Sequence, residues 1–518
     1  MRRRKLVLCV VDSLRTDMLH RAVAAGEAPV FAELLARGSL IEDCVSSFPS
    51  VTPVCCSDIV TGEAPDRHWI SGMNWYHRTE RRYVEYGSSF EATRAFGLFR
   101  TLYDIVYNMN MAHLSPEVET VFETLGDRGV RTACTPFLIY RGRSRHELGL
   151  EGMLRRVAMA ASFRHATWGP DELFYGELYS SRRVDCKPTL ARPGTRDEYS
   201  ACVGRDLVEN DLYDFLLFSL PDNDYHSHRD GPEGQPAAIS RADAALGELV
   251  DAAGGLEAFL ADHAVIVVAD HAQTDVEHPL ALAEELARDW AVLGPNEDPA
   301  SAELAVSPIA RAGAVYVLDE GLAGARIHAG VRERLAELEG VDLFAWLAAA
   351  DGEPLARDRG VADGGRAVVE RDGARLSFAP GGAVRDRRGV RWDLDGDPAA
   401  VAGTMDGESF DSAAYPDALS RLWAALHAPH AGDILISAAE RYELVDWGGM
   451  THCPGGSHGA LAAGDSLGPL LLCGLEAGVE RTRAQWTLRD VAGLVLGHFG
   501  VGAPRTGGPV AVGAGTAG

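Results

Sequence analysis

Three apolar runs that each lead into an aspartate constrain the fold of this chain most strongly. The runs are LVLCVV before Asp12, YDFLLFSLP before Asp222, and HAVIVVA before Asp270. Helix-like stretches separate them, which is typical of an α/β protein with a largely parallel central sheet flanked by helices. The carboxyl ends of parallel strands lie along one edge of the sheet, where α/β proteins bind ligands. We therefore expect the three aspartates to converge at one site.

The rest of the chain continues the alternation of strands and helices, with one change of character. A helix is expected over about residues 239–260 and a late strand over 469–474. Between residues 300 and 435 the chain becomes rich in Ala, Gly, Asp and Arg, with a helix expected near 329–350 and a hairpin-like segment over 372–397. We predict a discontinuous catalytic core over residues 1–299 and 436–502, an inserted cap subdomain over 300–435, and a disordered tail over 503–518.

The net charge and the composition limit the classes of molecule that this protein is expected to bind. The net charge of -26 argues against a nucleic acid or an anionic membrane surface as partner, so an anionic substrate would need a local reversal of the field. No apolar window is long enough for a transmembrane helix. The 9 cysteines are scattered and form no CxxC pair, which predicts reduced thiols in a cytoplasmic protein.

The three aspartates have imidazole groups near them in the sequence. His226 lies four residues after Asp222, His271 follows Asp270, and His458 lies in the glycine-rich segment GGSHGAL. A single aspartate at a strand end is usually a cap or turn residue, but three converging carboxylates repel one another unless a cation lies between them. Mixed carboxylate and imidazole ligands suit Zn²⁺, with Mn²⁺ as an alternative.

A helix start in the segment FPSVTPVCCSDIVTG offers a possible nucleophile. Thr52 precedes Pro53, and Gly62 follows the apolar run, so the segment is typical of a short helix with a hydroxyl N-cap. Thr52 could cap this helix and nothing more. Its hydroxyl could instead react at the positive end of the helix, where a phosphate group would be stabilised.

The order of these residues resembles the alkaline phosphatase superfamily, and within it the nucleotide pyrophosphatase/phosphodiesterase branch. The nucleophile segment of that branch is similar to FPTxTxPNxxSIVTG, with which FPSVTPVCCSDIVTG aligns without a gap. HWISGMNWY, which follows, resembles the H-G-I-x-x-N-x-x-Y pattern of the branch. The resemblance covers about residues 4–100, 205–280 and 450–475, and it implies an alkaline-phosphatase-like core.

The resemblance also implies roles for individual residues. It assigns Thr52 as the nucleophile that forms a covalent phospho-enzyme, and it implies a site with two divalent metal ions. The implied ligands of one ion are Asp222, His226 and His458, and those of the other are Asp12, Thr52, Asp270 and His271. His228 is an alternative to His226, which is favoured because the Asp-x-x-x-His spacing matches; Asp224 and Asp230 are interpreted as turn residues.

Two departures from the family pattern concern the substrate pocket. The phosphate-binding Asn of the family falls on Cys55, and the aromatic residue that often follows the nucleophile is Pro53. These differences weaken an expectation of nucleotide specificity. Cys55, Asn74, Trp75 and Tyr76 are the predicted substrate-binding residues.

The residues and the resemblance together predict a metal-dependent hydrolase of small-molecule phosphate esters, and the resemblance alone implies diesters or pyrophosphates as the preferred bonds. A phosphonate hydrolase or phosphomonoesterase on the same core is one alternative. A non-catalytic metal-binding member is another. The natural substrate and the oligomeric state do not follow from the sequence.

Overall fold

The fold is built around a mixed sheet whose middle strands are parallel. The computed structural model describes residues 3–149, 165–175, 178–187, 194–319, 321–349, 352–355, 364–476 and 482–502. In spatial order the strands of the central sheet are β2 (Ser39–Val45), β24 (Leu467–Cys473), β11 (His263–Val268), β1 (Lys5–Val11), β10 (Phe215–Leu220), β5 (Thr132–Cys134), β8 (Glu172–Tyr175) and β9 (Tyr179–Ser180). Strands β11 through β8 run parallel, whereas the pairs β2–β24, β24–β11 and β8–β9 are antiparallel.

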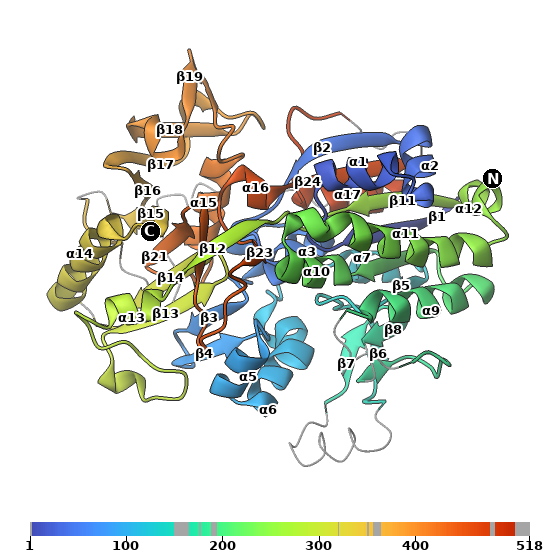
Figure 1. The fold of residues 1–518 in the computed structure, drawn as a ribbon, viewed down its shortest axis with the longest axis horizontal. Helices are drawn as coiled ribbons and strands as arrows, with labels where there is room; N and C mark the ends of the chain where they lie inside the picture. Colours follow the sequence, from blue (N-terminus) through green and yellow to red (C-terminus); the bar gives the residue numbers. More distant parts are fainter. Residues whose placement is uncertain are drawn as a thin grey trace, which may run out of the picture.

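The three aspartate-bearing runs occupy adjacent positions, because β1 lies between β11 and β10. Figure 1 shows the labels of β1 and β11 next to each other. Their register aligns Val10 with Val268 on one side and with Ser219 on the other. The strands therefore end together, as the sequence predicts. The predicted "largely parallel" sheet describes only this middle part, and the sheet as a whole is mixed.

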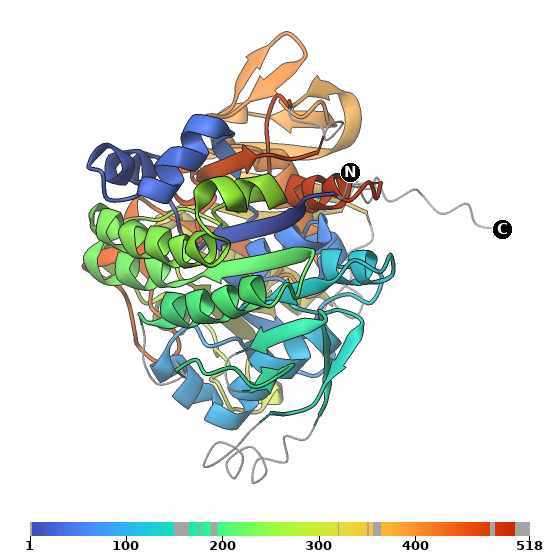
Figure 2. The ribbon, with the colours of Figure 1, turned by 90° about the vertical axis from the view of Figure 1, so that its right-hand side faces the viewer.

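Helices cover both faces of the central sheet (Figure 2). One face packs against α1 (Thr16–Ala24), α2 (Pro29–Arg37), α9 (Arg196–Glu209), α11 (Gln235–Ala252) and α12 (Leu256–Asp262). The other packs against α3 (Thr52–Thr61), α7 (Val121–Gly126) and α17 (Arg489–His498). Alternate residues of β1 enter the two cores, with Val7, Cys9 and Val11 on one side and Leu6, Leu8 and Val10 on the other. This period-2 alternation of a fully buried strand fixes the two layers.

A second sheet lies beside the central one and comes from the stretch where the composition changes. Its strands are β13 (Leu304–Ile309), β14 (Ala312–Val317), β21 (Ile434–Ala438), β15 (Val341–Ala348), β16 (Arg366–Arg371), β17 (Ala374–Arg385), β18 (Arg391–Gly396), β19 (Thr404–Asp406) and β20 (Ser409–Asp411). Helices α14 (Gly321–Glu337) and α15 (Ala418–His427) pack on it. One hydrophobic cluster runs from Leu8 of β1 to Trp392 of β18, so the two sheets share a core. The assignment of residues 300–435 to a separate cap subdomain stays a prediction.

Smaller elements complete the described fold. A third sheet joins β22 (Arg441–Leu444), β12 (Thr274–Leu280) and β23 (Gly455–Ser457), and two-stranded sheets pair β3 (Asn74–His77) with β4 (Arg82–Glu85) and β6 (Ser144–His146) with β7 (Thr167–Gly169). The remaining helices are α4 (Pro65–His68), α5 (Phe90–Phe96), α6 (Leu98–Tyr103), a π-helix (Asp104–His113), α10 (Asp222–Asp230), α13 (Leu282–Leu286) and α16 (Ala463–Ser466), with short 3₁₀ turns at Pro232–Gly234, Pro299–Ser301 and Pro398–Val401.

Two local predictions differ from the structure. The helix expected near 329–350 covers only residues up to Glu337, and residues 341–348 form the buried strand β15, whose apolar run was not recognised as a strand. The helix expected over 239–260 is divided at Gly254 and Gly255, both at positive φ. The predicted tail over 503–518 lies outside the described residues.

The prediction of reduced thiols is wrong for one pair. Cys186 and Cys202 form a disulfide, with their Cα atoms 5.9 Å apart. They lie 16 residues apart in the sequence, without a spacing motif that marks them as partners. Because the cytoplasmic expectation was inferred from unpaired cysteines, this argument loses its support. Among the described residues, no helix is long and apolar enough to cross a membrane.

A buried ion pair joins the second sheet to the layer of α17. Arg388, between β17 and β18, donates to both carboxylate oxygens of Asp490 at 2.7 and 3.1 Å, and the Asp490 side chain is fully buried. Arg388→Gln leaves this carboxylate without its bidentate partner and should lower the free energy of unfolding by about 2 to 3 kcal/mol. Urea unfolding measures this change. The exposed ion pair of Arg441 with Glu277 supplies the control, since Arg441→Gln should leave the midpoint almost unchanged. Equal effects of the two changes would contradict the prediction.

Candidate active site

Carboxylates from two adjacent strand ends meet at the edge of the central sheet. Asp12 follows β1, and Asp270 follows β11. The Asp270 carboxylate accepts hydrogen bonds from the backbone N–H groups of Ser13 at 3.1 Å and His271 at 2.9 Å. These bonds hold Asp270 beside the end of β1. The predicted convergence of Asp12 and Asp270 therefore occurs.

Two groups of side chains at this edge have the spacing of metal ligands. One group contains Asp12, Asp270 and His271, and the other contains Asp224, His271 and His458, each with its ligand atoms within 4.8 Å of one another. His271 Nε2 lies 3.6 Å from Asp12 Oδ1 and 3.5 Å from Asp270 Oδ2. His458 Nε2 lies 3.6 Å from Asp224 Oδ1. The rings of His271 and His458 stack with centroids 3.8 Å apart, so the two groups adjoin.

A third imidazole approaches the second group. His228 Nε2 lies 3.3 Å from Asp224 Oδ1. His228 is on α10, which packs closely against β23. The approach is so close that a Cβ on Gly455 or Gly456 would come within 2.5 Å of the backbone oxygens of His228 or Ser227. The two glycines of the GGSHGAL segment therefore allow the helix and the His458 segment to meet.

The hydrogen bonds of the three histidines leave the same ring nitrogen free. The Nδ1 atoms of His228, His271 and His458 lie 2.8, 3.2 and 2.8 Å from the carbonyl oxygens of Gly456, Ala272 and Ser50. A carbonyl oxygen only accepts, so each Nδ1 carries the proton and each Nε2 presents a lone pair. Burial lowers the pKa of each ring to about 4, so the rings are neutral at neutral pH. This is the state in which an imidazole ligates a metal, with its second nitrogen bound to a carbonyl.

The carboxylates show that positive charge fits between these groups. Asp12 Oδ1 and Asp270 Oδ2 are buried and have no hydrogen-bond partner among the described residues. Burial, then the charges of Asp270 and Asp224, raises the pKa of Asp12 well above its usual value, and burial raises that of Asp270 to about 6. Buried carboxylate oxygens facing imidazole lone pairs are destabilised by repulsion unless a cation lies between them. The donor set therefore fits divalent metal ions.

Thr52 lies at the same place, and its hydroxyl does not cap helix α3. The N-cap position is occupied by Val51, and no side chain forms a cap hydrogen bond, while Gly62 ends the helix in the left-handed conformation as predicted. The Thr52 hydroxyl instead lies 3.3 Å from His271 Nε2 and donates toward its lone pair. The cap interpretation of Thr52 is therefore wrong. The hydroxyl points into the candidate metal site.

Asp222 and His226 are not part of these groups, so the ligand role that the family resemblance implies for them stays a prediction. The Asp222 carboxylate accepts from the backbone N–H of Asp197 at 2.8 Å and from Arg196 Nε at 3.2 Å. The Asp197 carboxylate accepts in return from the backbone N–H of Asp222 at 3.0 Å. The two aspartates thus bind each other's helix starts, at α9 and α10. His226 Nε2 is buried and has no hydrogen-bond partner among the described residues.

The helical period explains why Asp222 and His226 lie apart from the two groups. The segment PDNDYHSH contains Asp-x-x-x-His twice, as Asp222 with His226 and as Asp224 with His228. Helix α10 begins at Asp222, and residues two apart on a helix point about 200° from each other around its axis. Only one of the two pairs can face the cluster. The doubled spacing was the signal for Asp224 and His228, which the sequence interpretation placed in a turn and left as an alternative.

Two further polar side chains at the site were not anticipated. Ser13 Oγ and Gln273 Nε2 each donate to Asp224 Oδ1 at 2.7 Å. They fix the orientation of this carboxylate beside His228 and His458. Ser13 directly follows Asp12, and Gln273 lies two positions after His271, which is the only signal the sequence offers for them.

The predicted substrate-binding residues are buried and have partners inside the protein. Cys55 is fully buried, which raises its thiol pKa well above the usual value. Asn74 donates to Glu85 at 2.9 Å, Trp75 stacks on His430, and Tyr76 contacts Tyr83. The contacts with Glu85 and Tyr83 join β3 to β4, whereas the contact with His430 joins β3 to the segment between α15 and β21. The assignment of these residues to substrate stays a prediction.

The comparison with protein families agrees with this arrangement. The family model described as type I phosphodiesterase / nucleotide pyrophosphatase matches residues 6–340, well over half of the chain. The chain therefore belongs to this family of hydrolases, which is part of the alkaline phosphatase superfamily. The matched residues include Asp12, Thr52, Asp224 and Asp270 but end before His458. A search of curated proteins gives no match.

The two aspartates of α10 provide a direct test of which of them binds metal. Asp224→Asn removes a carboxylate from the group with His458 and should weaken metal binding at that group by at least about tenfold. Asp222→Asn keeps an oxygen for the α9 backbone and should retain the metal, with a lower melting temperature. Elemental analysis after dialysis against metal buffers measures both. Loss of metal in Asp222→Asn with retention in Asp224→Asn would support the ligand set taken from the resemblance.

Proposed function

We propose that this protein hydrolyses phosphodiester or pyrophosphate bonds of small molecules, with Thr52 as the nucleophile beside two divalent metal ions. The observation that carries the proposal is that the lone pairs of His228, His271 and His458 face buried carboxylates, with the Thr52 hydroxyl at 3.3 Å from His271 Nε2. The family supports phosphoester hydrolysis in general. The preference for diesters over monoesters or phosphonates rests on the resemblance of the nucleophile segment.

The proposed ligands divide between two ions. Asp12, Asp270, His271 and Thr52 would hold one, and Asp224, His228 and His458 would hold the other. Zn²⁺ suits these nitrogen and oxygen donors, with Mn²⁺ as the alternative. When bound, such ions lower the pKa of the threonine hydroxyl and stabilise negative charge on the phosphate oxygens.

Thr52 is suited to the reaction by its place at the start of α3. The Oγ atom attacks phosphorus, the bond from phosphorus to the leaving oxygen breaks, and the hydroxyl proton ends on the leaving group. Water then attacks the phosphoryl group on Thr52, and one of its protons returns to the Thr52 oxygen. The N-terminal end of α3 carries partial positive charge, which stabilises the phosphate during both steps.

Metal removal tests the metal part of the proposal. The purified protein should contain about two divalent ions per chain. Chelation should abolish hydrolysis reversibly and lower the melting temperature, because the unpaired oxygens of Asp12 and Asp270 then repel each other and because ligand binding no longer stabilises the fold. Thermal unfolding with and without added Zn²⁺ provides a readout that does not depend on activity. An active preparation without metal would contradict the mechanism.

Thr52 variants test the nucleophile. Because the Thr52 side chain makes no cap hydrogen bond, Thr52→Ala should lose less stability than the roughly 0.5 to 2 kcal/mol of a lost N-cap. Turnover of bis-nitrophenyl phosphate should fall by about a thousandfold or more, since a reaction step loses its attacking atom. Thr52→Ser keeps the oxygen and should retain measurable turnover.

Three substrates and a trapping experiment complete this test. Nitrophenol release from the bis-ester, the monoester and a phosphonate ester ranks the diester reading against its alternatives. Mass spectrometry of the peptide 48–62 should find a covalent phosphoryl or nucleotidyl group in the wild type and none in Thr52→Ala. If Thr52→Ala hydrolyses diesters at nearly the wild-type rate, Thr52 is not the nucleophile.

A further inference from the structure

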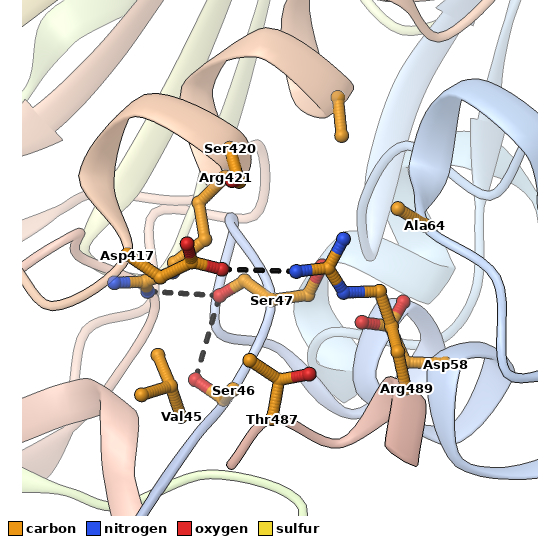
Figure 3. A pocket seen from close by; sticks show the side chains of 11 residues that line it. Val45, Ser46, Ser47, Asp58, Ala64, Asp417, Ser420, Arg421, Thr487 and Arg489 are labelled. Carbon is orange, nitrogen blue, oxygen red and sulfur yellow. Dashed lines mark hydrogen bonds and ion pairs between the residues drawn. The ribbon is translucent and has the colours of Figure 1, made fainter. Parts of the chain in front are cut away.

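A buried arginine from the second-sheet layer lies behind the candidate site. Arg421 is on α15, and only 4% of its surface is exposed. Its guanidinium donates to five neutral oxygens, those of Pro416 O, Leu461 O, Ser47 O, Ser50 Oγ and Ser466 Oγ. The nearby carboxylate of Asp417 is paired with Arg489 at 2.9 Å (Figure 3). Burial lowers the pKa of Arg421 to about 10, so it remains charged at neutral pH. A buried charge bound to neutral acceptors alone is unusual and needs an explanation.

Four of the five acceptors belong to two segments that each contain or adjoin a candidate site residue. Ser47 and Ser50 precede Thr52, and Figure 3 shows Arg421 joined to Ser47. Leu461 and Ser466 follow His458. The bond to Ser466 Oγ is the shortest of the five, at 2.6 Å. Arg421 therefore links the segment 46–51 to the segment 458–466.

These two segments are also bound directly to each other. Ser46 N donates to Ser466 O at 2.8 Å, Ser50 N donates to Gly459 O at 3.2 Å, and Ser50 Oγ donates to Ala460 O at 2.8 Å. His458 Nδ1 donates to Ser50 O at 2.8 Å, the bond that leaves His458 Nε2 free to face Asp224. The orientation of His458 thus depends on where Ser50 is held. Arg421 binds the side chain of that same serine at 3.3 Å.

We propose that Arg421 is a positioning residue, which fixes the Thr52 segment and the His458 segment in one geometry by hydrogen-bonding both from behind. The inference rests on the proposed function for the roles of Thr52 and His458, although the contacts of Arg421 are independent of it. A planar guanidinium can donate to several oxygens in fixed directions, which the single ammonium of lysine cannot. The need for this fork explains why a charge is retained in the core. It also gives the layer of α15, which follows the residues of the family match, a direct role at the site.

Arg141 offers a matched control. It also donates to the backbone carbonyls of Leu114 and Ser115 at 3.1 and 3.0 Å, and its mostly buried side chain, unlike that of Arg421, pairs with a carboxylate, Glu123, at 3.1 Å. None of these partners belongs to the segments around Thr52 or His458. Arg141→Gln therefore reports the general cost of removing a buried arginine.

The test compares Arg421→Gln, Arg421→Lys and Ser466→Ala with Arg141→Gln. Hydrogen exchange of metal-free protein should become faster by about tenfold or more in peptides covering 46–51 and 458–466 of Arg421→Gln. Zinc affinity at the His458 group should weaken by about tenfold, the usual effect of removing a residue that orients a ligand. The kcat should fall while KM changes less, because positioning acts on the reacting atoms. Arg421→Lys and Ser466→Ala should show smaller changes of the same kind.

The outcomes separate this proposal from its alternatives. If Arg421→Gln folds and its exchange and zinc affinity match those of Arg141→Gln, Arg421 is merely structural and the proposal is wrong. If Arg421→Gln does not fold, the test rests on Arg421→Lys and Ser466→Ala. Unchanged hydrogen exchange and unchanged zinc affinity in both of these variants would overturn the proposal. Retention of zinc and turnover in His458→Ala would refute the proposed function, while exchange in the metal-free protein would still report the role of Arg421.

Discussion

The repulsion among the carboxylates of Asp12, Asp224 and Asp270, of which the last is buried and the others mostly so, is the constraint on which the rest of the structure depends. Burial and mutual repulsion raise the pKa of Asp12 and Asp270. The imidazole lone pair of His271 faces the oxygens of these two residues, and that of His458 faces Asp224. In a buried environment such an arrangement is stable only when positive charge compensates it. A fold that keeps these groups together must therefore hold each of them firmly while it leaves room for a cation.

Elements from different parts of the chain hold these side chains in place. The parallel register of β11, β1 and β10 aligns the strand ends, and the backbone bonds from Ser13 and His271 fix Asp270. The reciprocal bonds between Asp197 and Asp222 set the start of α10, and the helical period then turns Asp224 and His228 toward the site. His458 depends on residues much later in the sequence. Its carbonyl accepts from Arg311 N at 2.8 Å, between β13 and β14, and Asp465 in the same segment forms a buried ion pair with Arg311.

The sequence was sufficient to predict the position of a site residue where one physical rule alone determines that position. Strand ends of a parallel sheet must lie on one edge, so the convergence of Asp12 and Asp270 could be predicted without a structure. It was insufficient where two pairs of residues satisfy the same rule. Asp222 with His226 and Asp224 with His228 share the spacing, and only the start of α10 decides between the two pairs. Thr52 illustrates a third case. Its hydroxyl could cap the helix by type and position, but a partner distant in sequence, His271, determines where it points.

Contacts between distant segments explain the other differences. The disulfide of Cys186 with Cys202 depends on how the segment after β9 meets α9, and β15 depends on pairing with β16 and β21, whose apolar faces it completes. Neither pairing can be deduced from the local sequence, although the apolar run of β15 is itself typical of a strand. The role of α15 is of the same kind, since Arg421 reads as an ordinary charged residue of an amphipathic helix until its acceptors are seen.

The acidic character of the chain and an anionic substrate are compatible because they act over different distances. A net charge of -26 repels an anion during approach, but in physiological salt this field decays over about 8 Å. The interactions at the site act at contact, from bound cations and from the N-terminal end of α3, in surroundings that screen them little. The overall charge therefore governs how often a substrate arrives. The site governs whether it stays and reacts, which is why the local geometry of Asp12, Asp224, Asp270 and their histidines carries the functional argument.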